Sequence, residues 1–196
     1  MLAQGREQMD WQNLPTIEAN RIRLRWVSEA DIDALYTIFS DPEVMRYWSS
    51  PPIADRDAAA KIVAEIHEGF ASRAHLKWGL ARLTDDMVIG TVTLYGLNLE
   101  HRRAEIGYAM GRAHWGNGYM QEALQALLGF AFDVLHLHRI EADVDPRNAA
   151  SIRSLEKLGF QREGYLRERW QVGGEIQDAL FYGLLRSDWE GRNQAG

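Results

Sequence analysis

The segment 103–144 contains four patterns in immediate succession: a strand, a glycine-rich turn, a long helix and a second strand. RAEIGYAM at 103–110 is typical of a partly buried strand, and HWGNG follows it at 114–118. Apolar residues then recur at helical spacing from Met120 to about Leu135, and HRIEADV at 138–144 is the second strand. Two strands joined by a helical crossover run parallel, so this unit predicts a parallel pair within a sheet.

The other patterns surround this unit with strands and helices. Strands are predicted at 21–27, 76–83 and 88–95. A hairpin is predicted from 163–172 and 175–185, joined by a GGE turn. Helices are predicted from about 29 to 39, from 42, at 55–71 and from 149 to 158. We therefore expect one α+β domain with a mixed, mostly antiparallel central sheet and flanking helices. Residues 1–19 are expected to form an N-terminal arm, 20–190 the domain and 191–196 a C-terminal tail.

The composition excludes several classes of protein. The 196 residues suit one domain, and the absence of cysteine removes disulfides, thiolate zinc sites and a cysteine nucleophile. A formal net charge of −6 argues against a nucleic-acid partner. We find no apolar run of about 18 residues and no signal-peptide core, so we expect no membrane segment and a cytoplasmic protein. His136 and His138 lack a third ligand at metal-like spacing, and we expect no metal.

The glycine turn at 116–118 leads directly into a helix. A helix N-terminus presents unpaired backbone N–H groups and a partial positive charge, and Gly116 and Gly118 let an anion approach the main chain. Together these features predict a phosphate cradle. The spacing fits neither a P-loop nor the dinucleotide fingerprint. A plain glycine-rich turn with no ligand is the competing interpretation.

Several separated segments resemble one family. They read LRWVSEADIDALY, DPEVMRYW, AEIGYAM, HWGNGYMQEAL, HRIEADVDPRNAASIRSLEKLGFQREG and D…FYGLLRSDW. From about Ile22 to Trp189, this series resembles the GNAT superfamily of acyl-CoA-dependent N-acetyltransferases. Within it, the chain looks like the Rim-type branch, which includes ribosomal-protein N-terminal acetyltransferases. One glycine pair would be weak evidence, whereas the order and spacing of the whole series are specific.

The resemblance implies that acetyl-CoA is the cosubstrate. The family's pyrophosphate loop covers Trp115 to Met120, where Trp115 replaces the usual Arg or Gln and Met120 replaces a small residue. Asn148 caps a helix and would contact the cofactor arm, while Arg153 would bind a phosphate or lie on a solvated helix face. The predicted cofactor-binding residues are Ala109, Met110, Gly111, Trp115, Gly116, Asn117, Gly118, Tyr119, Met120, Gln121, Asn148, Ser151 and Arg153.

Acetyl transfer to an amine needs a base, because an alkyl amine has a pKa near ~10.4. Glu105 is the first candidate, since many relatives place an acidic residue at this position; otherwise it pairs with Arg102 or Arg103. Glu163 is the second, at a position where Rim-type relatives carry a glutamate; otherwise it forms a salt bridge with Arg162 or Arg167. Leu155 stands where many members carry the tyrosine that protonates the leaving thiolate, which leaves that role without a firm candidate.

The function predicted is transfer of an acetyl group from acetyl-CoA directly to a primary amine, either a protein N-terminus or a small amine. Fold does not fix the acceptor. The alternative is a non-catalytic acyl-CoA-binding or sensor module, and a nucleotide-binding domain is a third reading. Met45, Tyr47 and Trp48 are either core residues or the lining of the acceptor side. The resemblance also makes a homodimer one expected assembly, because dimers are frequent in such families.

Overall fold

The computed structural model describes residues 11–193, whose strands form one sheet in the order β1-β2-β3-β4-β5-β6-β8-β7. Neighbouring strands are antiparallel except β5 and β6, which run parallel. The predicted mixed sheet and its parallel pair are therefore confirmed. The strands are β1 (Ile17–Glu18), β2 (Ile22–Arg25), β3 (His75–Arg82), β4 (Val88–Asn98), β5 (Arg103–Met110), β6 (Arg139–Val144), β7 (Gln161–Val172) and β8 (Glu175–Leu185).

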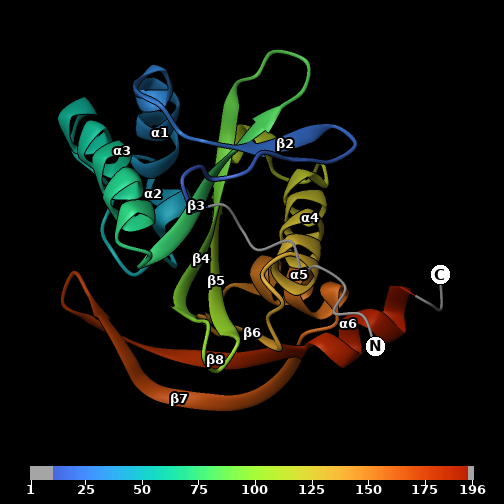
Figure 1. Ribbon diagram of the computed structural model, residues 1–196. Coiled ribbons are helices and arrows are strands. Elements are labelled where there is room, and N and C mark those ends of the chain that lie inside the picture. Colours follow the sequence, from blue (N-terminus) through green and yellow to red (C-terminus); the bar gives the residue numbers. More distant parts are fainter. Residues whose placement is uncertain (1–10, 194–196) are drawn as a thin grey trace.

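The helices divide between the two faces of the sheet. They are α1 (Ile32–Phe39), α2 (Pro42–Met45), α3 (Arg56–Ala71), α4 (Tyr119–Asp133), α5 (Ala149–Leu158) and α6 (Arg186–Asn193). Figure 1 shows α1–α3 on one side of β3–β5, and α4 and α5 on the other. Each face has its own apolar core, in which α3 contributes Val63 and Ile66 on one side and α4 contributes Leu124 and Leu127 on the other. One stripe of each helix is thereby buried, as the periodicity predicts.

Local hydrogen bonds fix where these helices begin and end. Ser28 and Asp31 form a capping box, and the Asp41 carboxylate accepts a hydrogen bond from the Glu43 amide at 2.9 Å. Asn148 caps α5 by accepting from the Ser151 amide at 3.1 Å. Gly159 ends α5 with φ +95°, the left-handed conformation expected of a C-cap glycine.

The described part of the N-terminal arm packs on the domain. Leu14 is buried, Trp11 stacks near Phe70, and the Trp78 indole donates to the Pro15 carbonyl at 2.8 Å. At the other end, α6 extends through residues 191–193, where the sequence predicted the start of a tail. Residues 1–10 and 194–196 lie outside the described residues.

The parallel strands β5 and β6 pair over only part of their length. Arg103, Ala104 and Glu105 face 139–141 in register. Within the described chain the register ends there, although β5 continues to Met110 and β6 to Val144. The two strands therefore diverge at their carboxyl ends. Beyond the split, the backbone and side chains of the two strands do not pair with each other and can contact a ligand.

The contact between β4 and β5 gives a test of the fold. A Cβ at Gly90 would stand 2.6 Å from the Ala109 carbonyl oxygen, closer than packed backbones allow. Gly90→Ala should therefore push the strands apart and lower the free energy of unfolding by about 1–3 kcal/mol in urea denaturation. In the control Gly129→Ala, on α4, a Cβ meets nothing within 4 Å, and the variant should gain about 0.5–1 kcal/mol. Equal effects of the two substitutions would contradict this packing.

Candidate active site

Two cavities meet at the split between β5 and β6. The larger, of about 530 Å³, is lined by the end of β5, the glycine turn, the start of α4 and the start of α5. The smaller, of about 370 Å³, is lined by β3–β6 and by residues of β7, β8 and the segment after α2. Four residues belong to the walls of both: Tyr47, Tyr108, Asn148 and Ser151. A molecule in each cavity would meet its neighbour at this shared wall.

Most of the residues predicted to bind the cofactor line the larger cavity. They are Ala109, Met110, Trp115, Gly116, Gly118, Tyr119, Met120, Gln121, Asn148 and Ser151. Gly111, Asn117 and Arg153 do not line either cavity. Gly111 is buried behind the end of β5, and Arg153 is exposed on α5. Ten of the thirteen predicted residues thus share one wall, and their role in binding the cofactor stays a prediction. Arg153 faces solvent, because helical spacing alone does not say which way an arginine points.

The glycine turn has the backbone conformation of a cradle. Gly116 has φ +75° and Gly118 has φ +79°, both in the left-handed region that glycine adopts without strain. Gly118 is the N-cap of α4, and no side chain caps the helix there. The first amides of α4 are therefore not covered by a capping side chain, and they lie at the wall of the larger cavity.

Side chains around the turn hold it in this shape. The side-chain amide of Asn117 donates to the carbonyls of His114 and Trp115, both at 3.1 Å. The Trp115 indole donates to the Met110 carbonyl at 2.7 Å. Arg21 reaches across from the start of β2 and donates to the Asn117 carbonyl at 3.1 Å. Asn117 therefore shapes the turn and does not line the cavity. Trp115, which replaces the family's Arg or Gln, ties the turn to the end of β5.

Tyr108 and Ser151 form a hydrogen-bonded pair in the shared wall. Their hydroxyl oxygens lie 2.7 Å apart, and burial raises the pKa of Tyr108 to about 12. Tyr108 therefore stays protonated at neutral pH. The pair connects β5 to α5 at the place where the two cavities meet.

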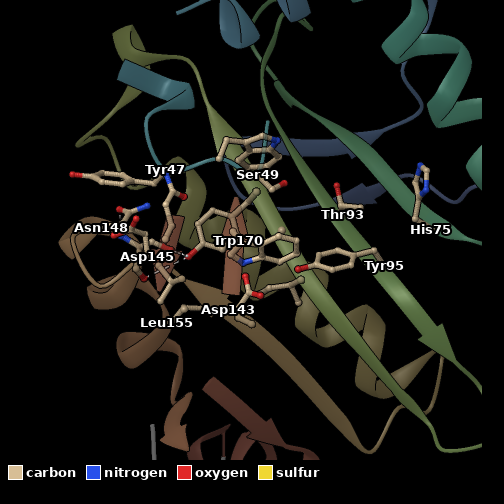
Figure 2. A pocket seen from close by; sticks show the side chains of 18 of the residues that line it. Tyr47, Ser49, His75, Thr93, Tyr95, Asp143, Asp145, Asn148, Leu155 and Trp170 are labelled. Atoms are coloured by element: carbon tan, nitrogen blue, oxygen red, sulfur yellow. Dashed lines mark hydrogen bonds between the residues drawn. The ribbon is translucent and has the colours of Figure 1, made fainter. Parts of the chain in front are cut away.

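The smaller cavity carries charge of both signs. Figure 2 shows Asp143, Tyr95 and Trp170 grouped in its middle, with Asp145 and Asn148 toward one end and His75 toward the other. Asp145 is buried and its carboxylate is bound by Arg147 at 2.7 Å. Lys77, on β3, also lines this cavity.

Two carboxylates near the split have raised pKa values. Burial raises the pKa of Glu105, and the nearby charges of Asp143 and Glu141 raise it further. Burial also raises the pKa of Asp143, although Arg169, at 3.4 Å, opposes this. Asp143 lines the smaller cavity; Glu105 does not line it but faces the lining residue Tyr95 across β4 and β5. Arg103 pairs with Glu141 at 2.8 Å, not with Glu105.

Comparison with known proteins identifies the family. The Acetyltransferase (GNAT) domain matches residues 21–161. The chain belongs to the GNAT acetyltransferase family. "Uncharacterized N-acetyltransferase p20" of Bacillus licheniformis is 38% identical over 182 residues, which cover 91% of this chain and 100% of that protein. The chain is accordingly an acyl-CoA-dependent N-acetyltransferase.

Solved structures share the fold of this acetyltransferase. RimJ of Mycobacterium smegmatis, in complex with CoA-disulfide, superposes with a TM-score of 0.82 at 23% identity, covering 93% of this chain and 95% of RimJ. Spermidine N-acetyltransferase of Vibrio cholerae, in complex with CoA and spermine, gives 0.76 at 24% identity, covering 87% and 98%. At these identities the likeness concerns the fold alone.

The described residues of the acetyltransferase contain neither a membrane-spanning helix nor a metal-binding cluster. Within residues 11–193, no helix is long and apolar enough to cross a bilayer. The same residues contain no cluster of three or more His, Asp and Glu placed to hold a metal ion.

The second predicted catalytic residue of the acetyltransferase, Glu163, lies outside both cavities. Both of its carboxylate oxygens accept hydrogen bonds from the Arg139 guanidinium, and this pairing holds the pKa of Glu163 below its ordinary value. A carboxylate held in its charged form by an arginine is a poor proton acceptor. The prediction that Glu163 acts on the acceptor is therefore not supported by its position. The sequence indicated a salt bridge as the alternative but named Arg162 and Arg167. It could not show that β8 lies between β6 and β7, where the side chains of Arg139 and Glu163 meet over Gly183.

Sequence reasoning missed most residues of the smaller cavity, among them Tyr108, Asp143 and Lys77, which carry polar or charged groups. Tyr108 stood inside the quoted AEIGYAM motif, and its hydroxyl could have been noted as a donor. Asp143 follows Glu141 by two positions on β6, a spacing that puts both carboxylates on one face. Lys77 gave no signal, because alternation along β3 does not reveal a cavity. Tyr47 and Trp48 line the smaller cavity, whereas Met45 is buried in the core.

The position of Glu163 yields a prediction. Glu163→Gln should lower the free energy of unfolding by about 1 kcal/mol or less at pH 7, because the ion pair is partly exposed. Since the folded-state pKa is lowered, this advantage of the wild type should hold above the ordinary value of 4.5 and vanish as the pH falls below it. Urea denaturation at several pH values measures it. Turnover should stay within about twofold, and a tenfold loss would return Glu163 to the active site.

Proposed function

We propose that this acetyltransferase moves the acetyl group of acetyl-CoA directly to a primary amine. The observation that carries the proposal is the shared wall of the two cavities. The larger cavity has the glycine cradle expected for a diphosphate, and the smaller has carboxylates suited to an amine. A direct transfer needs the thioester and the amine to meet without a protein nucleophile, and the shared wall provides such a meeting place.

The larger cavity fits the cosubstrate by its chemistry. Amides from Gly116 to Gln121 would hold the diphosphate, because their N–H groups are uncapped and the helix terminus favours an anion. The end of β5, at Ala109 and Met110, would pair with the pantetheine arm as an added strand does. RimJ, which shares this fold, was solved with CoA-disulfide, so the fold is compatible with a CoA ligand. Acetyl-CoA supplies the activated acetyl thioester; the protein supplies position and proton transfer.

Glu105 and Asp143 are proposed to accept the proton of the amine. The charge of Asp143 helps to raise the pKa of Glu105, and Asp143 faces the cavity while Glu105 adjoins it. A carboxylate with a raised pKa is a better base, because its pKa lies closer to the pKa of the amine. In the step, the amine nitrogen forms the new C–N bond, the C–S bond breaks, and the carboxylate pair holds the proton lost by nitrogen.

Tyr108 is proposed to give a proton to the departing thiolate. Its hydroxyl lies in the wall common to both cavities, paired with the Ser151 hydroxyl. It would fill the role that Leu155, buried in the wall of the smaller cavity, cannot perform.

A module that binds acyl-CoA without turnover is the second candidate function, and the leucine at position 155 favours it. We place the reaction in the cytoplasm, as the sequence predicts.

The function is tested by mixing the protein with acetyl-CoA and a panel of primary amines and measuring free thiol. We expect thiol release that depends on the amine, and an at least tenfold weaker apparent affinity for acetyl-CoA in Gly118→Val, because valine is strained at φ +79°. The control Gly173→Val has comparable strain at φ +56° in the β7–β8 turn, and its affinity should be unchanged. Binding of acetyl-CoA without thiol release for any amine would leave the non-catalytic module.

The proposed base predicts a pH dependence. Activity should fall as the pH drops through the pKa of the Glu105–Asp143 pair, which is raised, so the acid limb should lie above the ordinary carboxylate value of 4.5. Glu105→Gln should lower kcat by about 10²-fold or more and change that limb. Steady-state rates from pH 5 to 9 measure both effects.

Two further variants sharpen this experiment. Tyr108→Phe should lower kcat but leave the acid limb in place, because the phenol acts on the thiolate and not on the amine. Glu100→Gln, at an exposed turn residue, should change neither. A Glu105→Gln enzyme with the wild-type profile would remove Glu105 from the role.

A further inference from the structure

A lysine without a carboxylate partner lies in the wall of the smaller cavity. Lys77 is partly buried, and within residues 11–193 it forms no ion pair closer than 4.0 Å. Its ammonium nitrogen lies 5.1 Å from the centre of the Phe39 ring on α1. A buried ammonium is costly unless something compensates its charge, and one aromatic ring compensates only part of it.

The surroundings of Lys77 leave its charge available to a ligand. Burial lowers the pKa of Lys77 to about 8, and the field of Glu65 on α3 partly opposes this. Its neighbour on β3, His75, has a pKa lowered by burial and by Lys77, so its imidazole is neutral at pH 7. The lysine is therefore mainly charged at pH 7. An anion in the cavity would meet one cation and no competing carboxylate in contact with it.

The register places Lys77 at a distance from the carboxylate pair. Lys77 faces Thr93 on β4, and Thr93 faces Gly107 on β5, beside the split. Two strand spacings separate Lys77 from Gly107, which is about 10 Å. Asp143 lies across the split on β6 and lines the same cavity. In Figure 2, His75, which neighbours Lys77 on β3, stands at the opposite end of the cavity from Asp145 and Asn148.

We propose that the acceptor is an amine that also carries a carboxylate at the far end of its carbon chain, and that Lys77 binds this carboxylate. The inference rests on the proposed function and specifies its acceptor. With the carboxylate on Lys77, the amine reaches back toward Asp143 and the shared wall. A diamine of the same length would place a cation against Lys77, and an alkylamine would leave the ammonium unpaired. The cavity should therefore prefer the amino acid over both.

Three probes of equal length test this acceptor chemistry: 6-aminohexanoate, hexylamine and 1,6-diaminohexane. For the wild type with acetyl-CoA, kcat/KM should be at least tenfold higher for 6-aminohexanoate than for either other amine. Lys77→Met should remove that preference, because KM for 6-aminohexanoate should rise to the range of the other two amines. The variant should fold, because it removes a buried charge. Lys61→Met, at an exposed lysine of α3, should retain the wild-type preference.

Binding of the same probes to the CoA-loaded protein, followed by calorimetry, separates the two proposals. If hexylamine or the diamine reacts as well as 6-aminohexanoate, the acetyltransferase function stands and the carboxylate subsite is wrong. If no amine reacts but 6-aminohexanoate binds in a Lys77-dependent manner, the subsite stands and the proposed function fails. If Lys77→Met changes neither binding nor preference, the inference is overturned.

Discussion

The divergence of β5 from β6 is the constraint on which the site depends. The two strands run parallel and pair only as far as Glu105 and Glu141, although β5 continues to Met110 and β6 to Val144. The opening divides the sheet without exposing its apolar cores, since α4 covers one face and α1–α3 the other (Figure 1). Each of the two cavities takes part of its wall from this opening, and Tyr108 and Ser151 lie where the cavities meet.

Electrostatics gives the two cavities different preferences. Uncapped amides after Gly118 favour an anion in the larger cavity, and the turn that presents them is braced by Arg21, Asn117 and Trp115. In the smaller cavity, Asp143 stands near the split and Lys77 stands toward its other end. Burial raises the pKa of Asp143 and lowers that of Lys77, so each group gains from a ligand of opposite charge. The same cavity can thus hold an amine at one end and an anion at the other.

The sequence predicted the fold in detail and the site in part. Strands and helices were predictable because apolar periodicity and caps such as Ser28, Asp41 and Gly159 agree with each other. The glycine turn was predictable because positions with a positive φ are usually occupied by glycine. Arg153 and Glu163 were assigned to the site from family positions, yet one faces solvent and the other pairs with Arg139. Lys77 could not be found from the sequence, and the spacing of Glu141 and Asp143 did not show a cavity, because that cavity is made by strands that are distant in sequence.

We propose above all that the backbone amides of the glycine turn bind the diphosphate of the cosubstrate. The most direct measurement is a titration of ¹⁵N-labelled protein with CoA, followed through the backbone amide resonances. We predict the largest shifts at residues 116–121, with smaller ones at Ala109 and Met110. Shifts centred on another surface, with the amides of Gly116 and Gly118 unmoved at saturation, would contradict it.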